Sequence, residues 1–196
     1  MIMDIYYRIE FFSNWHCGSG LAAGADVDAL VVKDSDGLPY IPGRTLKGLL
    51  REAASELSND SDLLRKIFGI PAKSEKNEKE KDEKEKDSVI RGEKRIGEAF
   101  FGNATLTDGP TIIAAKLTHH LFQTFASTAI DENTGIAKDS SLRKIETVVP
   151  CTLDGQIKNL PDEGRELIEQ AMQMVKRIGT GRNRGYGRCF VSVIEG

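Results

Sequence analysis

The sequence predicts an α+β fold whose elements follow one another as strand, helix, strand, strand, helix, strand. Two amphipathic helical patterns, over residues 46–57 and 162–178, are preceded, separated and followed by short apolar or alternating segments. The chain has 196 residues, 39% of them hydrophobic, which is enough for one domain with a packed core. This order of elements is that of the ferredoxin-like (RRM-like) βαββαβ fold.

The first half of the chain supplies a strand and a helix. Residues 4–12 partly alternate and predict the first strand. Residues 28–33, DALVVK, are compatible with a short strand or with the edge of a loop. After Pro42 and Gly43 the apolar residues recur at helical spacing, at positions 46, 49, 50, 53, 54 and 57. We therefore expect the first helix to begin here.

The second half supplies the remaining elements. We expect strands over residues 111–118 and 145–153, and Pro150 places the latter at a sheet edge or a bulge. The second helix is expected over residues 162–178, with acidic residues in its first turn and Gly179 at its stop position. Residues 188–195 alternate and predict the closing strand.

Two insertions interrupt this order. The first spans about residues 72–92 and includes residues 73–87, which hold six lysines and seven acidic residues. Such a segment cannot bury an apolar face, so we expect a solvated, charged loop. The second spans residues 118–144 and is rich in turn residues, among them Asp131, Asn133 and Gly135. We expect it to leave the core as an excursion within a single domain of residues 1–196.

Composition limits the compartment and the chemistry. The three cysteines, Cys17, Cys151 and Cys189, are odd in number and lack metal-ligand spacing, which argues against a zinc site or a disulfide scaffold. The chain begins without a basic segment followed by an apolar one, and no apolar run has the length of a membrane span. We therefore expect a cytoplasmic protein.

The distribution of charge favours a phosphate ligand despite a net charge of −3. Residues 176–188 contain five basic residues and no acidic one, and a local basic patch can bind phosphates on an acidic protein. Within them lies the loop GTGRNRGYGR, residues 179–188. Its glycines allow close approach of a phosphodiester, its amides and arginines can bind phosphate, and its tyrosine can stack on a base. The residues concerned are Gly179, Gly181, Arg182, Arg184, Gly185, Tyr186, Gly187 and Arg188. The alternative is a tight helix-to-strand turn with solvated arginines.

A second basic group lies at the start of the first helix. Arg44, Lys47 and Arg51 are three or four residues apart, so they can form a row of cations beside a helix N-terminus that itself attracts phosphate. The alternative is an ordinary exposed helix face.

Four segments, spread over nearly the whole chain, resemble the RAMP superfamily of CRISPR-associated proteins, and among them the backbone subunit of type III (Csm/Cmr) effector complexes. They are FFSNWHCGSG (11–20), DALVVKDSDGLPYIPGRTLKGLLR (28–51), AIDENTGIAKDSSLRKIETVVP (129–150) and the loop GTGRNRGYGR. A further stretch, FFGNATLTD (100–108), also resembles the family.

The resemblance implies a subunit that binds a guide RNA (crRNA). Its implied partners are the guide crRNA, a complementary target RNA, other effector subunits and copies of itself along the guide. Lys47 and Arg51 match positions that hold the guide backbone in relatives, and His16 falls on a family histidine. Residues 118–144 correspond to a thumb that wedges into the guide–target duplex. Arg44 and Glu132 depart from the family pattern, which has a small residue and an arginine there.

The resemblance also implies an endoribonuclease that cleaves the target. In cleaving relatives an aspartate before the strand matching residues 29–34 is required, which implies Asp28 as the catalytic residue and a candidate metal ligand. Asp26 lies two positions earlier and would point the same way in an extended loop. Two such carboxylates can hold Mg²⁺ or another divalent cation against a phosphate while the 2′-hydroxyl of the RNA attacks. The alternative is a pair of surface aspartates.

Three other functions remain open from the sequence. The first is a non-catalytic structural RAMP subunit of the same complex. The second is a metal-independent endoribonuclease that processes the guide precursor, with His16, His119 and His120 as acid–base candidates. The third is an interaction module that binds no RNA.

Overall fold

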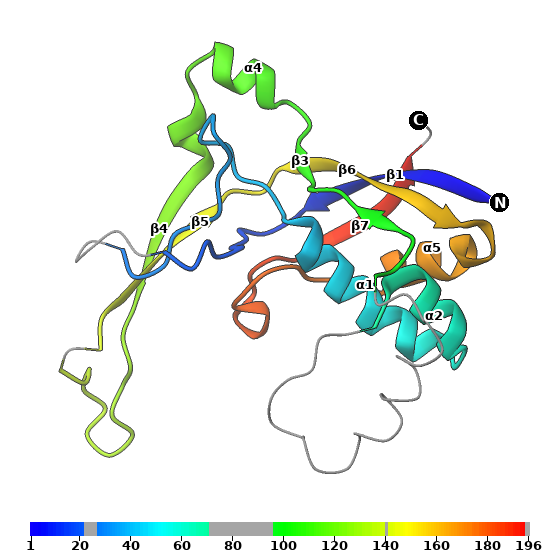
Figure 1. Ribbon diagram of the computed structural model, residues 1–196. Coiled ribbons are helices and arrows are strands. Elements are labelled where there is room, and N and C mark those ends of the chain that lie inside the picture. The colour runs from blue at the N-terminus through cyan, green and yellow to red at the C-terminus, as the bar shows by residue number, and fades with distance from the viewer. Residues whose placement is uncertain (22–26, 71–95, 140, 195–196) are drawn as a thin grey trace.

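The computed structural model describes residues 1–21, 27–70, 96–139 and 141–194 (Figure 1). The main sheet contains β1 (Ile2–Phe11), β2 (Phe100–Phe101), β3 (Thr105–Leu106), β6 (Thr152–Pro161) and β7 (Cys189–Ile194). A separate hairpin contains β4 (Phe122–Ser127) and β5 (Arg143–Val148). The α-helices are α1 (Gly43–Leu57), α2 (Ser61–Phe68), α4 (Gly109–Ala114) and α5 (Arg165–Met174), and the 3₁₀ helices are η1 (Thr118–Leu121), η2 (Asp162–Gly164) and η3 (Arg182–Arg184).

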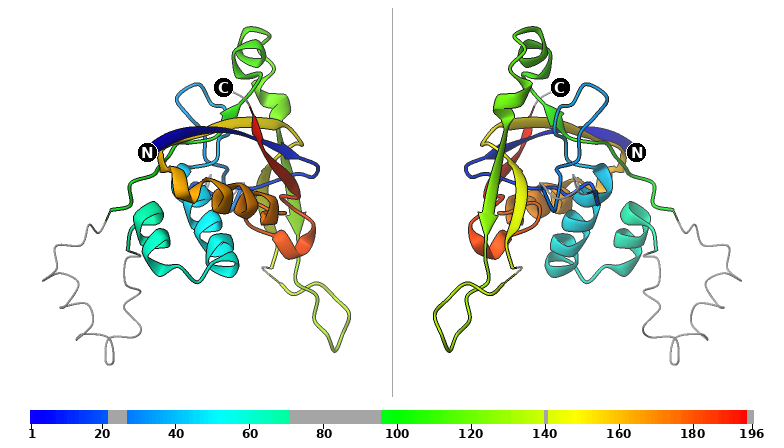
Figure 2. Two further views of the ribbon diagram at one scale, coloured as in Figure 1. Left: turned by 90° about the vertical axis from the view of Figure 1, so that its right-hand side faces the viewer. Right: turned by 90° about the vertical axis from the view of Figure 1, so that its left-hand side faces the viewer.

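The main sheet is antiparallel throughout. Its strands follow the order β2, β6, β1, β7, and β3 also pairs with β6. The expected first and last strands are confirmed as β1 and β7, and they lie side by side, so that Ile9 is flanked by Leu153 and Val191. Helices α1, α2 and α5 lie on one side of this sheet (Figures 1 and 2).

The core fills the space between this sheet and its helices. β1 alternates between buried and more exposed residues, because successive side chains of a strand point to opposite faces. Tyr7 and Ile9 meet Leu46 and Leu50 of α1 and Ile168 of α5 in one buried cluster, and none of these five is more than 1% exposed. Each such side chain stabilises the fold by about 1.5–3 kcal/mol relative to exposure. Four members of the stripe predicted for the first helix, Leu46, Leu50, Ala53 and Ala54, are therefore its core face, whereas Leu49 is partly buried and Leu57 is exposed.

The β4–β5 hairpin projects from the main sheet (Figure 1). Its strands pair from Phe122 and Val148 at the root to Ser127 and Arg143 at the far end. At the root, Trp15 and Val148 exchange two main-chain hydrogen bonds of 3.0 and 2.8 Å, and both residues are fully buried. The hairpin is thus attached to the core at one end.

Three sequence predictions about single elements are wrong. The expected strand over residues 111–118 is helix α4 followed by η1. Pro110 stands in the first turn of α4, where its missing N–H costs nothing, and the segment packs too little apolar surface to require a strand. The expected strand over residues 145–153 is two strands, because the chain leaves β5 at Val148 and enters β6 at Thr152, with Pro150 between them.

The third correction concerns the second helix, which is shorter than residues 162–178. A 3₁₀ turn, η2, precedes it, and α5 ends at Met174.

Residues 28–33 form isolated bridges, Ala29 with Ile145 and Val31 with Gly18, instead of a continuous strand. The whole of the charged insertion at 72–92 lies outside the described residues, and so does Asp26. Over the described ranges, no helix is long and apolar enough to span a membrane.

Candidate nucleic-acid interface

The glycine-rich loop takes its shape from four left-handed residues. Gly179, Gly181, Gly185 and Gly187 have φ angles of 98°, 71°, 90° and 70°. A Cβ on Gly179 would overlap the carbonyl of His16, and one on Gly187 would overlap the carbonyl of residue 178, whereas the space around Gly185 is open. Two of the glycines are therefore required by close backbone packing as well as by the dihedral angle.

This packing presses the loop against the segment that follows β1. The amide and hydroxyl of Thr180 both donate to the carbonyl oxygen of His16, at 2.9 and 3.4 Å. The amide of Gly187 donates to the carbonyl of Asn14 at 2.8 Å. The two ends of the loop are thus fixed, and η3 between them carries the exposed side chains of Arg182 and Arg184.

The ring of His16 is oriented by a hydrogen bond to the main chain of β5. Its side chain is largely buried, and its Nδ1 lies 2.6 Å from the main-chain oxygen of Glu146. A carbonyl oxygen only accepts, so Nδ1 carries the proton of this hydrogen bond and Nε2 is the ring nitrogen left for other partners. Nε2 is also the atom that a Cβ on Gly18 would approach, at 3.2 Å.

A cleft of about 400 Å³ lies between the glycine-rich loop and the first turns of α1. It brings together four of the residues predicted to bind RNA, which are His16, Arg44, Gly179 and Arg182. Within the described ranges neither Arg44 nor Arg182 forms an ion pair. The loop and the start of the first helix therefore converge, and their guanidinium groups are available to an anion.

The start of α1 contributes a helix N-terminus to this cleft, whose lining also includes the acidic residue Glu52. Pro42 precedes the helix and no side chain caps it, although the Gly43 amide donates to Oδ1 of Asn103 at 2.9 Å. The positive end of the helix dipole thus lies beside Arg44 at the cleft wall. Such a helix terminus suits a phosphate group.

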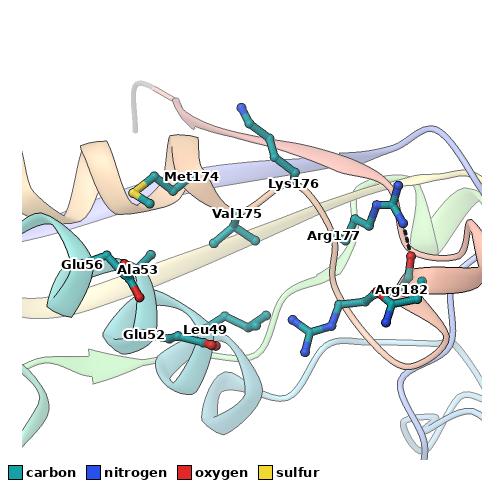
Figure 3. A pocket seen from close by; sticks show the side chains of 10 residues that line it. Leu49, Glu52, Ala53, Glu56, Met174, Val175, Lys176, Arg177 and Arg182 are labelled. Atoms are coloured by element: carbon teal, nitrogen blue, oxygen red, sulfur yellow. Dashed lines mark hydrogen bonds between the residues drawn. The ribbon is translucent and has the colours of Figure 1, made fainter.

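A second cavity of about 420 Å³ continues from the cleft along α1 (Figure 3). The two cavities share Leu49, Glu52 and Arg182. Arg177 donates to the carbonyl oxygen of Arg182 and so helps to hold η3 in place (Figure 3). Arg182 therefore stands at the junction of both cavities.

Lys47 and Arg51 are not brought into the cleft. The ammonium group of Lys47 lies 5.9 Å from the ring centroid of Phe101. The guanidinium of Arg51 lies over the ring of Phe68 and donates to the carbonyl oxygens of Phe68 and Gly69, at 2.7 and 2.6 Å. These carbonyls end α2, where intrahelical partners are missing. Partial burial lowers the pKa of both Lys47 and Arg51.

The second half of the loop faces the hairpin. The ring of Tyr186 meets Phe125 of β4 edge to face, with centroids 5.9 Å apart and an interplanar angle of 66°. Beside it, Nδ2 of Asn14 donates to Oε1 of Gln123 at 2.9 Å and to Oγ1 of Thr147 at 3.2 Å. Arg188 is exposed next to this contact, and its amide donates to Ser13 at 2.9 Å.

Asp28 lies on the edge of the hairpin, and its side chain is exposed. Its amide donates to the carbonyl of Lys144 at 2.8 Å, and its Oδ2 accepts from the Lys144 amide at 2.6 Å. The segment after it is held by Glu146, whose carboxylate accepts from the amide of Val31 at 3.0 Å and from the ammonium of Lys33 at 2.8 Å. Asp28 is therefore fixed in place while Oδ1 has no partner among the described residues.

Among the residues that the structure describes, Asp28 has few other metal-ligating side chains around it. No group of three or more His, Cys, Asp or Glu side chains assembles over the described part of the chain. A single exposed carboxylate with a free oxygen still fits Mg²⁺, which keeps several waters and takes one or two carboxylates together with substrate phosphates. Asp26, the other candidate ligand, lies outside the described residues.

Sequence reasoning missed two residues that organise this interface. Glu146 is a polar residue within an apolar strand pattern, and its carboxylate is only 13% exposed, which is a signal of a specific partner. Phe125 lies in the alternating segment FQTFAS, where an aromatic residue was visible but its neighbour in space was not.

These features define a RAMP-type protein, and comparison with known families agrees: the chain belongs to the RAMP superfamily, whose model matches residues 8–190. The resemblance inferred from the four motifs is thereby confirmed. The chain is similar to the protein of Streptococcus thermophilus named CRISPR system Cms endoribonuclease Csm3, with 26% identity over 204 residues that cover 92% of this chain and 83% of that protein.

Two solved structures show a similar fold. One is the type III-B Cmr-beta complex bound to cognate target RNA, with a chain that matches at a TM-score of 0.63 and 12% identity and covers 97% of both chains. The other is the apo state of the type III-B Cmr-beta complex, with the same TM-score and identity and 98% coverage of both chains. The mixed α+β fold with antiparallel sheets is shared with these chains.

Proposed function

We propose that this protein is a guide (crRNA)-binding backbone subunit of a type III CRISPR effector complex. One observation carries the proposal: the glycine-rich loop and the start of α1 form one cleft, with Arg182 on one side and Arg44 on the other. Two cations that form no ion pair with another described residue, together with a helix N-terminus, surround a space of about 400 Å³ and suit a ribose-phosphate strand. Membership of the RAMP superfamily supports the same function.

The strand order supports a ferredoxin-like core for this subunit. In chain order, β1, β2, β6 and β7 would be the first to fourth strands of this core. Read across the sheet, the order β2, β6, β1, β7 is then second, third, first, fourth. α1 follows the first strand and α5 follows the third. This order supports a βαββαβ arrangement in which the β4–β5 hairpin is inserted before the third strand.

In this proposal the cleft binds the guide through its backbone and not through its sequence. Arg44 and Arg182 contact phosphates, and Nε2 of His16 faces the same strand. Neither cation is positioned by an ion pair within the described ranges, so binding would be electrostatic and sensitive to salt. Further copies of the chain and other effector subunits would extend along the guide, and a complementary target RNA would pair with it.

We further propose that Asp28 serves cleavage of that target. Asp28 would hold a divalent cation, which when bound neutralises charge on the scissile phosphate. Because Oδ2 is held by the Lys144 amide, the carboxylate has a fixed direction and presents Oδ1 to solvent. Without a cation on it, the same oxygen could instead accept the proton of the attacking 2′-hydroxyl, so the two roles are alternatives for Oδ1.

A non-catalytic structural subunit is the second candidate. The observation that favours it is the reciprocal hydrogen bonding of Asp28 with Lys144. These bonds attach the Asp28 segment to β5, so they give the aspartate a structural role that needs no catalysis. His119 and His120 bear on the third candidate, a processing nuclease. Their rings lie 3.9 Å apart in η1, outside the residues that line the cleft.

The test is copurification from cells that express the whole effector complex. We expect the tagged chain to retain a guide RNA with repeat-derived ends, and the purified complex to cleave only a complementary RNA, and only with Mg²⁺. Guide retention without cleavage would select the structural subunit. Cleavage of a repeat hairpin in EDTA would select the processing enzyme. RNA affinity that is independent of salt would contradict all three.

A further inference from the structure

The glycine-rich loop has a second side, which does not face the cleft. Arg182 reaches the cavities along α1, whereas Tyr186 contacts Phe125 of the β4–β5 hairpin. Between them Arg184 is exposed in η3. An RNA strand that leaves the cleft along this loop would therefore pass Arg184 and reach the rings of Tyr186 and Phe125.

The contact between Phe125 and Tyr186 is partly exposed to solvent. Phe125 is 39% exposed, and Tyr186 is only partly buried. Rings that are 5.9 Å apart at 66° meet edge to face, so this contact itself covers at most one face of one of the two rings. An exposed ring face beside cations is the arrangement that stacks a nucleobase, because every base has a π face.

The backbone around Tyr186 keeps this space open. Gly185 and Gly187 flank the tyrosine with left-handed φ angles, and nothing lies within 4 Å of a Cβ built on Gly185. On its other side, Cδ2 of the Tyr186 ring lies 2.7 Å from where a Cβ of Gly181 would be. The ring of Tyr186 thus lies close to the backbone of Gly181, where any other residue would place a Cβ against it.

We propose that Phe125 and Tyr186 form a stacking site for one nucleobase of the bound RNA, at the junction of the hairpin and the glycine-rich loop. This inference rests on the proposed function, and it adds a base contact to a subunit whose other contacts are with phosphates. The site is sequence-tolerant, since stacking does not depend on the hydrogen-bonding edge of the base.

The experiment uses the full chain and a short single-stranded RNA of about ten nucleotides with 2-aminopurine at one position, moved along the strand in separate oligonucleotides. At one position we expect the fluorescence to be quenched on binding. Phe125→Leu and Tyr186→Leu should abolish this quenching and weaken binding about five- to 150-fold, which corresponds to the loss of one stacked base. Tyr186→Phe should retain both.

The matched control is Phe100→Leu, which removes an aromatic side chain that is 59% exposed on β2, at the opposite edge of the main sheet from β7. It should leave quenching and affinity unchanged. If Tyr186→Leu does not fold, Phe125→Trp supplies the test, because a stacked base should quench the new indole emission. Unchanged quenching in Phe125→Leu, with binding that still depends on Arg182, would overturn the stacking site alone. Absence of salt-dependent binding by the unchanged chain would overturn the proposed function.

Discussion

The carboxylate of Asp28 accepts a hydrogen bond of 2.6 Å from the amide of Lys144, while the amide of Asp28 donates to the carbonyl of the same residue at 2.8 Å. This reciprocal pair attaches the segment before Val31 to strand β5. The side chain of Asp28 therefore has two separable properties, its hydrogen bond to the hairpin and its negative charge.

Asp28→Asn separates these two properties. The amide oxygen of asparagine can still accept from Lys144, so we expect guide binding and assembly to be unchanged. Loss of the charge should lower cleavage of a labelled complementary RNA about 100-fold or more, as for other acid–base groups. The wild-type complex in EDTA is the parallel measurement of metal removal. Unchanged cleavage at every site would remove Asp28 from the mechanism.

Arg182→Gln should weaken RNA binding and reduce its dependence on salt. Each lost phosphate contact to a single strand should lower the slope of log affinity against log salt by about 0.7. Arg44→Gln should act in the same direction, and the double variant should lose about twice as much slope. Arg165→Gln, which removes an arginine paired with Glu169 on α5, is the control and should not change the slope. If Arg165→Gln lowered the slope as much as Arg182→Gln or Arg44→Gln, phosphate binding in the cleft would be contradicted.

Arg51→Met should destabilise the fold. The guanidinium of Arg51 donates to two carbonyl oxygens at the end of α2. A hydrogen bond to a charged group contributes about 1.5–3 kcal/mol to the free energy of unfolding. We expect the free energy of unfolding, measured with urea, to fall by about 1–3 kcal/mol. The salt slope of RNA binding by the folded variant should stay unchanged. A reduced slope at full stability would show instead that Arg51 contacts the guide.

Gly179→Ala should be more damaging than Gly185→Ala. Both residues have φ angles near +90°, so either alanine costs about 1–2 kcal/mol of backbone strain. At Gly179 the new Cβ would also overlap the carbonyl of His16, whereas at Gly185 the space is open. Thermal unfolding of the two variants measures the difference. Equal melting temperatures would mean that the loop does not pack on His16.

The ion pair of Arg8 and Asp154 should make stability depend on pH. Hydrogen bonding from Arg8 holds the pKa of Asp154 below its ordinary value of 3.8. The unfolded chain therefore takes up this proton first as the pH falls, so the pair stabilises the fold above about pH 4 and its contribution is lost at lower pH. The melting temperature of Arg8→Gln should lie below that of the wild type near neutral pH, and the two should converge in acid. A constant difference would contradict the linkage.

The sequence predicted those parts of the fold whose patterns are local. The alternation of β1 and the helical spacing of α1 are each sufficient to define an element, and their boundaries were nearly correct. The glycine-rich loop was also predictable, since its composition exceeds what a turn requires. The segment TIIAAKLT was misassigned because its β-branched residues favour a strand, and the start signal of Pro110 was not weighed against them.

The parts of the site that could not be predicted depend on long-range neighbours. Arg51 lies one helical turn after Lys47, so the sequence places both on one face of the helix. Only the position of α2 shows that the guanidinium of Arg51 already donates to main-chain carbonyls. Phe125 and Tyr186 are 61 residues apart in the chain and meet in space, so no local pattern relates them. The convergence of Arg44 and Arg182, which are far apart in the sequence, is likewise seen only in the cleft of the folded chain.

The contacts of the β4–β5 hairpin are spread along its paired strands: Trp15 bonds to Val148, Tyr186 meets Phe125, and Asp28 bonds to Lys144. The last of these lies one residue from the far end of the pairing, where Ser127 faces Arg143. The direction in which residues 128–139 project (Figure 1) is therefore fixed by segments that are distant in the sequence, the glycine-rich loop among them.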